Sequence, residues 1–199
     1  QLVGAYFLHE YSFEAAALFN PSIVPHPDQS GVAEGCRRFI LSVRAVGEGH
    51  ISSLTFRSGI LAADGTVTID PPARLAATPD VTARVGGHLE LSFDPASDIA
   101  GRVIFPVTEM QANGIEDARF VAFSDEGQTI YYATYTAYSG RGIRSELLET
   151  RDFVTFRLTP LRGPAARNKG MALFPRKIGG RYAMIARHDN ESLHLILSD

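Results

Sequence analysis

The chain has 199 residues, of which 45% are hydrophobic and 21% charged, a composition that favours a folded protein over general disorder. Its formal net charge of −3 gives no basic surface for nucleic acid, and its one cysteine excludes an internal disulfide. It contains no apolar run of about 18 residues and no clustered His or Cys motif typical of a metal site. We therefore expect no nucleic-acid partner, no membrane span and no bound metal.

The N-terminal part predicts one short helix and then strands. Phe13–Phe19 contains good helix formers and is followed by Asn20–Pro21, which predicts a helix of about two turns or an irregular lead-in of the same length. Three short strands are expected beyond it, with an Asp-Gly pair typical of a hairpin between the last two. They are Arg38–Val46, Ile51–Gly59 and Gly65–Asp70.

The rest of the chain repeats this pattern of short strands and turns. Residues 71–109 are less regular: 71–80 is typical of a loop, His88–Phe93 alternates like a strand, and Pro106 argues against a central strand. A second meander is expected over Ala118–Phe123, Thr129–Tyr138, Ile143–Thr150 and Phe153–Pro160. A third is expected over 170–178, 181–189 and 192–199, with a tight turn at Gly179–Gly180. Units recurring at a spacing of about 50–60 residues are typical of propeller blades.

Two acidic residues precede a strand in the segment Asn113–Arg119. Strand alternation places Asp117 and Arg119 on one face and Glu116 on the other. A carboxylate held near a guanidinium suits a general acid or the binding of sugar hydroxyls. An ordinary ion pair at a strand edge is the structural alternative.

Three further places carry polar or aromatic side chains that suit a ligand. The Arg44–His50 segment carries Glu48 and His50 on a glycine-bearing turn, which is either a polar loop over a ligand or an ordinary hairpin. Arg167, Asn168 and Lys169 suit a phosphate or sulfate-like group, although a solvated loop has the same composition. Tyr138 at a strand end is the aromatic residue that we expect to face a ligand, whereas the other tyrosines suit the core.

Taken together, several segments resemble glycoside hydrolase family 130, the mannoside phosphorylases and related mannosidases. The segments are FNPSIV (Phe19–Val24), FILSVRAVGEGHISS (Phe39–Ser53), NGIEDARFVAF (Asn113–Phe123), YYATYTAY (Tyr131–Tyr138) and NKGMALFPRKIGGRYAMIARHD (Asn168–Asp189). They span most of the chain in the family's order. The stretch VGEGHISSLTFRSG is most similar to the subgroup called glycosidase-related proteins.

The resemblance implies an all-β fold, a five-bladed β-propeller with its active site in a central depression. Family members are longer than this chain, so we expect residues 1–199 to be an incomplete propeller domain that supplies about three blades. The blade-like units are expected at about 20–70, 103–160 and 168–199.

The resemblance also implies roles for individual residues. Asp117 matches the general acid that protonates the leaving glycosidic oxygen, and Arg119 in the same motif is expected to orient it. Asn20 and Arg44 match positions that line the sugar pocket. Arg167, Asn168 and Lys169 lie near the phosphate-contacting basic segment of the family. His50 and Tyr138 join the expected substrate-binding residues because of their own sequence context.

The expected reaction is inverting phosphorolysis of β-mannosides to mannose 1-phosphate, with inorganic phosphate as co-substrate and no cofactor. Two departures bear on the phosphate site: Ala186-Arg187-His188 stands where the family commonly has His-Arg-Pro, and Lys169-Gly-Met where it has Lys-Asp-Ala.

Three alternatives to phosphorolysis stay open. One is an inverting β-mannosidase, which needs a second carboxylate about 6.5–9.5 Å away. The others are a glycan-binding propeller without activity and a different five-bladed glycosidase with Glu109 or Glu48 facing Asp117.

Some properties are left open by the sequence. The glycan substrate, the oligomeric state, with a homo-oligomer as one option, and the sequence beyond each end are among them. The cellular location is also open, with the cytoplasm slightly favoured.

Overall fold

The computed structural model describes residues 11–85, 87–187, 189 and 191–199, and β-strands form most of it. The first group of strands is an antiparallel meander whose members pair in chain order. They are β1 (Ala17–Pro25), β2 (Arg37–Val46), β3 (Ser52–Leu61) and β4 (Val67–Ile69). The turn between β3 and β4 contains the Asp64–Gly65 pair, and Gly65 has a φ of 87°, so the predicted hairpin is confirmed.

Of the two predictions for Phe13–Phe19, the helix is wrong: residues 13–16 are turns and bends, as expected of an irregular lead-in, and β1 begins at Ala17. The Ala16 amide donates to the Val46 carbonyl, and Glu14 forms an ion pair with Arg57 on β3. A helix of about two turns has few internal hydrogen bonds to compete with such pairing. Pro21 is accommodated because β1 is an edge strand with a bulge at this point.

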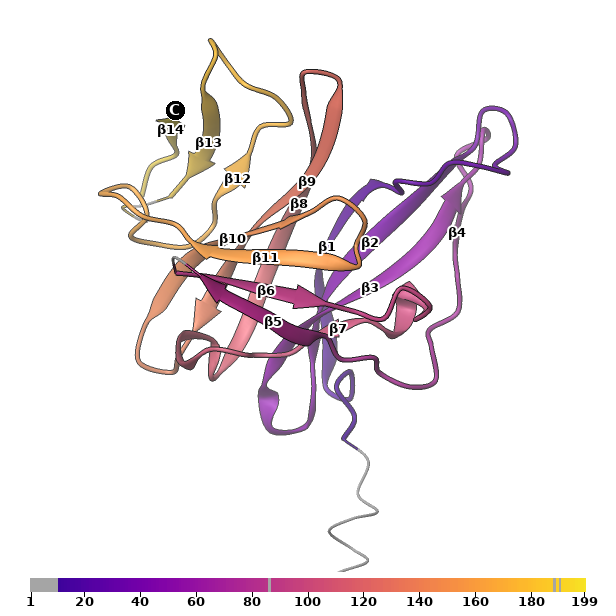
Figure 1. Cartoon of the computed structure of the whole chain (residues 1–199), viewed down its shortest axis with the longest axis horizontal. Helices are drawn as coiled ribbons and strands as arrows, with labels where there is room; N and C mark the ends of the chain where they lie inside the picture. The colour runs from indigo at the N-terminus through magenta and orange to yellow at the C-terminus, as the bar shows by residue number, and fades with distance from the viewer. Residues whose placement is uncertain (1–10, 86, 188, 190) are drawn as a thin grey trace, which may run out of the picture.

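A second, larger group of strands forms the centre of the molecule (Figure 1). Four of its strands are a meander in chain order, and two earlier strands extend it beyond β11. The meander is β8 (Gly114–Asp125), β9 (Gln128–Tyr138), β10 (Ile143–Thr150) and β11 (Thr155–Pro160). The extension is β6 (His88–Ser92), which pairs with β11, and β5 (Asp80–Val85), which pairs with β6. The sequence predicted β6 as a strand but gave no sign of β5 or of this pairing.

Short elements connect the groups. β7 (Val103–Ile104) pairs with β3 and ends before Pro106, and Ser52 of β3 meets Gly114 of β8 in a parallel bridge. Three 3-10 turns lie at Glu48–His50, Ile99–Gly101 and Glu109–Gln111. A separate small sheet contains β12 (Ala172–Leu173), β13 (Tyr182–Ala186) and β14 (His194–Ser198). Its predicted tight turn is present, with Gly179 and Gly180 both at positive φ.

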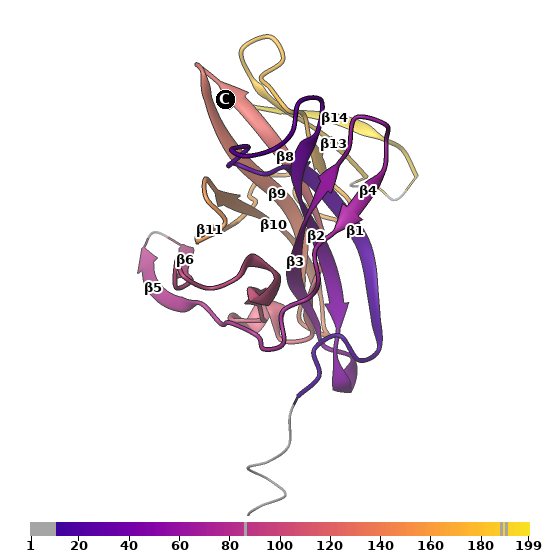
Figure 2. The same cartoon turned by 90° about the vertical axis from the view of Figure 1, so that its right-hand side faces the viewer.

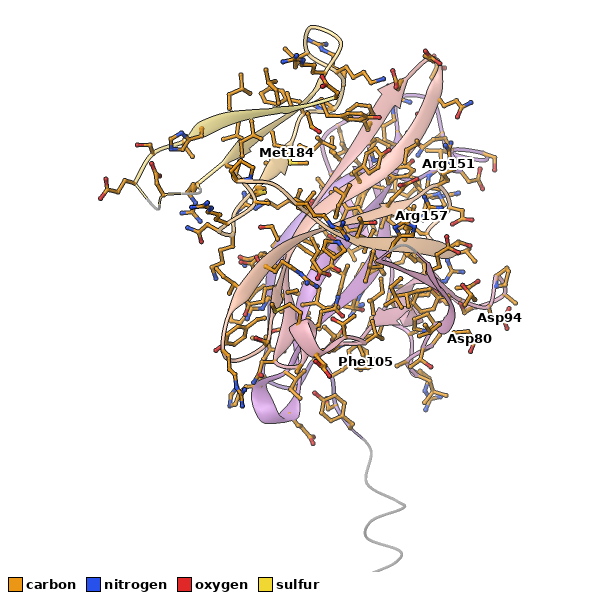
Figure 3. The ribbon with its side chains drawn as sticks, turned by 60° about the vertical axis from the view of Figure 1, so that its left-hand side comes forward. Asp80, Asp94, Phe105, Arg151, Arg157 and Met184 are labelled. Carbon is orange, nitrogen blue, oxygen red and sulfur yellow. The ribbon has the colours of Figure 1, made fainter. Side chains whose placement is uncertain are left out.

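The main core lies between the β1–β3 meander and the β8–β11 group with β6; Figure 2 shows β6 and β11 on the left and β1 and β2 on the right. Phe56 is fully buried at its centre, with its ring 5.8 Å from the rings of Phe153 and Phe156. Figure 3 shows Phe105 at the end of the molecule next to the N-terminal segment, where it contacts Tyr11 edge-on at 6.5 Å. The aromatic content of the strands therefore serves mainly to fill the core.

The small sheet packs on the other face of β8–β10. The Thr134 hydroxyl donates to the Met171 carbonyl at 2.5 Å, and the Tyr182 ring stacks on Phe123 at 5.3 Å. The fold is thus mostly β, as predicted, and strands occur in all three predicted units. Over the described residues the sheets do not close into a ring, so the five-bladed propeller and the blade limits stay predictions. No helix in this part of the chain is long and apolar enough to cross a membrane.

Candidate active site

The candidate site forms where two strand bulges face each other. The β1–β2 register shifts between Phe19 and Ser22, and the β8–β9 register shifts between Glu116 and Arg119. Within these bulges Asn20 has a φ of 48° and Asp117 a φ of 55°. Left-handed backbone at a non-glycine residue costs about 1–3 kcal/mol and is concentrated at functional sites. Bulges redirect side chains, and here they direct both residues toward each other.

Asn20 and Arg44 hold the Asp117 and Glu116 carboxylates. The Asn20 amide donates to Asp117 Oδ1, and Arg44 Nη1 donates to the same oxygen at 3.3 Å. Arg44 Nη2 donates to Glu116 Oε1 at 2.8 Å, while its Nε donates to Ser52 Oγ at 2.9 Å. The expectation that Glu116 points away from Asp117 is therefore wrong. The bulge interrupts strand alternation, so one guanidinium binds both acids.

These groups are partly withdrawn from solvent but still reachable. The side chains of Arg44, Glu116 and Asp117 are 22%, 12% and 27% exposed. Screening by water is weaker at such a site than on an open surface, which strengthens the ion pairs. The Arg44 guanidinium also lies 6.0 Å from the centre of the Phe19 ring.

Lys169 reaches the same cluster from the segment before β12. Its Nζ lies 3.5 Å from Glu116 Oε2, and the segment is fixed by Ser145, whose hydroxyl donates to the Asn168 carbonyl at 2.5 Å. Asp117 and Lys169 line a small cavity of about 30 Å³. Arg119 and Arg187 line it as well. Three cations around one carboxylate make this cavity suited to an anion.

The remaining predicted site residues lie around this cluster. Arg119 is exposed and lines the cavity, but the contacts on Asp117 come from Asn20 and Arg44, so its orienting role stays a prediction. His50 is exposed in the Glu48–His50 turn, and Tyr138 is half-buried at the end of β9 opposite Gly114. Arg167 is exposed. In the described structure the last three make no hydrogen bond or ion pair with Arg44 or Asp117.

Sequence reasoning did not identify Glu116, Ser52 or Arg187 as site residues. Glu116 carried a signal, since it is adjacent to Asp117, but alternation assigned it to the wrong face. Ser52 lies opposite Val46 in the hairpin that carries Arg44, which only a strand register reveals. Arg187 was noted only within a departure from the family pattern.

A second polar cluster lies on the other side of β9 and β10. The buried Glu146 carboxylate accepts hydrogen bonds from the Tyr135 hydroxyl at 2.5 Å, Gln111 Nε2 at 3.1 Å and Arg144 Nε at 2.9 Å. Burial, together with this carboxylate, raises the pKa of Tyr135 well above its ordinary value. Glu146 and Glu109 line an open cavity of about 1140 Å³. Glu109 and Asp117 thus line different cavities.

The family model described as beta-1,4-mannooligosaccharide phosphorylase, that of glycoside hydrolase family 130, matches residues 88–199, more than half of the chain. The chain belongs to glycoside hydrolase family 130. The matched region contains Glu116, Asp117, Lys169 and Arg187, whereas Asn20 and Arg44 lie before it.

Two individual proteins are similar to the chain. The β-1,2-mannobiose phosphorylase of Listeria innocua serovar 6a is 33% identical over 92 residues, which are 45% of this chain and 24% of that protein. The chain thus spans about a quarter of the curated relative's length. The solved complex of a Listeria innocua β-1,2-mannobiose phosphorylase with β-1,2-mannobiose aligns with a TM-score of 0.43 and 16% identity. That alignment covers 90% of this chain and 58% of the other.

Proposed function

We propose that the protein containing this chain cleaves β-mannosides with inversion by phosphorolysis, releasing mannose 1-phosphate. The observation that carries the proposal is the position of Asp117. Its carboxylate is held by Asn20 and Arg44 and faces a cavity lined by Lys169 and two arginines. Membership of glycoside hydrolase family 130 supports the same class of substrate.

The proposed reaction uses each group for one task. Protonated Asp117 donates its proton to the leaving glycosidic oxygen as the bond from that oxygen to the anomeric carbon breaks. An oxygen of inorganic phosphate forms the new bond to the anomeric carbon from the opposite face, which inverts its configuration. Lys169 and Arg167 offset the negative charge of the phosphate, and the neutral Asn168 amide serves as a hydrogen-bond donor to it. Because phosphate is itself the nucleophile, a second carboxylate is not needed as a base.

Glu116 is not arranged as the general base of an inverting hydrolase. An inverting hydrolase needs a general base on the opposite face of the sugar ring, with room for a water molecule. Glu116 instead shares the Arg44 guanidinium with Asp117, so both carboxylates lie on the same side of the cluster. Its other oxygen is directed to Lys169.

The test uses the full-length protein with β-1,2- and β-1,4-mannobiose in the presence and absence of phosphate. We expect mannose 1-phosphate to form only when phosphate is present. Asp117→Asn should lower kcat at least about a hundredfold, as expected for loss of a general acid. Asp125→Asn is the matched control, because Asp125 is at the far end of β8 and pairs with Lys177 at 2.6 Å.

Other outcomes would contradict the proposal. Free mannose formed at the same rate without phosphate would identify a β-mannosidase. Binding of mannobiose without turnover would identify a glycan-binding propeller. Full activity in the Asp117→Asn protein would exclude Asp117 as the acid.

A further inference from the structure

Glu116 bridges two cations that come from distant parts of the chain. One carboxylate oxygen accepts from Arg44 Nη2 at 2.8 Å, and the other lies 3.5 Å from Lys169 Nζ. Glu116 is the most buried member of this group, with 12% of its side chain exposed, against 22% for Arg44 and 44% for Lys169. The fixed member is thus the carboxylate, and the two cations are arranged around it.

Lys169 needs such a partner to have a defined position. A lysine side chain has a flexible four-carbon stem, and fixing it costs rotamer entropy. The backbone around Lys169 is held by the Ser145 hydroxyl and the Asn168 side chain, but these contacts do not fix the ammonium group. The ion pair with Glu116 gives Nζ its direction.

Arg44 depends on Glu116 in a different way. A guanidinium pairs preferentially with two acceptors, and Arg44 Nη1 and Nη2 contact Asp117 and Glu116 respectively. Without the Glu116 carboxylate, Nη2 would lose its acceptor, and Arg44 would be held by Ser52 and Asp117 alone. Glu116 therefore joins Arg44, which contacts the acid, and Lys169 through one carboxylate.

We propose that Glu116 is a positioning residue that sets where Lys169 and Arg44 lie, and thereby couples the phosphate-binding cation to the arginine that holds the acid. This inference rests on the proposed phosphorolysis for its kinetic consequences. Glu116 contacts neither phosphate nor the reacting atoms in this scheme. It acts through Lys169 and Arg44.

The kinetic test compares Glu116→Gln, Lys169→Met and the double variant in the full-length protein. Glutamine keeps an oxygen for Arg44 but loses the charge that attracts Lys169. We expect Glu116→Gln to raise the phosphate KM about fivefold, the upper range for a partly exposed ion pair. The mannoside KM should change less than about twofold. Because Glu116 acts through Lys169, the double variant should have the phosphate KM of Lys169→Met alone.

Two results would overturn the inference. One is a phosphate KM that rises in the double variant by the product of the fold-changes in the two single variants. The other is an unchanged phosphate KM in Glu116→Gln while Lys169→Met raises it. Glu149→Gln, a half-buried acid on β10, is the matched control and should leave both KM values unchanged.

A structural readout separates this inference from the proposed reaction. In a crystal structure of the full-length Glu116→Gln protein we expect Lys169 Nζ to leave its wild-type position. An unmoved Lys169 Nζ would overturn the positioning role whichever reaction the enzyme performs. Turnover independent of phosphate, with a displaced Lys169, would instead reject phosphorolysis and keep the positioning role.

Discussion

The Asn20 side-chain amide donates a hydrogen bond to the Asp117 carboxylate, and both residues have left-handed backbone inside strand bulges. The two residues are 97 positions apart in the chain. Each bulge alone is a strained local feature, and the hydrogen bond connects them. The bulges in β1 and β8 therefore bring the Asn20 amide and the Asp117 carboxylate together.

Replacing Asn20 by glycine separates this hydrogen bond from the backbone strain. Glycine adopts a φ of 48° without the strain that a Cβ atom causes, so Asn20→Gly should lower the melting temperature less than Asn20→Ala. Loss of a hydrogen bond to a charged group is worth about 1.5–3 kcal/mol, which predicts a fall in kcat/KM of about tenfold or more. Asn20→Ala should show the same loss of activity and lower stability by about 1 kcal/mol more, because alanine is strained at this φ. Full activity in Asn20→Gly would show that Asp117 is oriented without Asn20.

Removing the Tyr135 hydroxyl should destabilise the fold. The hydroxyl donates to buried Glu146 and accepts from Gln111, so phenylalanine leaves a buried carboxylate with one partner fewer. We expect Tyr135→Phe to lower the free energy of unfolding by about 1–3 kcal/mol in urea titrations. Tyr138→Phe at the half-buried end of the same strand should change it by less than about 0.5 kcal/mol. Equal effects in the two variants would contradict the role of the Glu146 cluster.

Stability should fall at alkaline pH because of the buried tyrosines. Burial, with Glu149 nearby, raises the pKa of Tyr132 to about 12, and burial raises the pKa of Tyr135 well above its ordinary value. An unfolded tyrosine loses its proton at about pH 10, so above that pH the unfolded state binds fewer protons than the folded state. The free energy of unfolding should therefore be constant up to about pH 9 and decrease from about pH 10 to 12. In urea titrations at several pH values, the free energy of unfolding of Tyr132→Phe should decrease less steeply with pH than that of the wild type. An identical pH dependence in the two proteins would reject the assignment to Tyr132.

Because Gly170 has no side chain, it leaves room for the Arg187 guanidinium in the cavity beside Lys169. Its φ is 83°, and a Cβ atom built there would lie 2.9 Å from Arg187 Nη2. We expect Gly170→Ala to displace the Arg187 guanidinium and to raise the phosphate KM by about fivefold, as Arg187→Met should also do. Gly179→Ala is the matched control, since Gly179 also has positive φ but open space around its Cβ position. Gly179→Ala should reduce stability without changing the phosphate KM. An increase in the phosphate KM equal to that of Gly170→Ala would instead assign the effect to backbone strain.

Most strands could be predicted from the sequence because their signals are local. Alternation and turn pairs predicted β2, β3, β9 and β10, and Asp64–Gly65 and Gly179–Gly180 form the expected turns. The segment Phe13–Phe19 shows the limit of such signals. Its residues favour a helix, but pairing of Ala16 and Ala17 with Val46 and the Glu14–Arg57 ion pair decide its conformation.

The sequence by itself determined the family pattern and the residue types of the site, with Asn20, Arg44, Asp117 and Lys169 among them. Only the tertiary structure decided how they meet. Strand alternation has a period of two, so it placed Glu116 on the wrong face; the bulge in β8 breaks that period and gives Arg44 both acids. Glu116 and Lys169 are 53 positions apart, and their contact depends on the packing of the segment before β12 against β9 and β10. Such contacts depend on which surfaces pack together, and a local pattern carries no information about that packing.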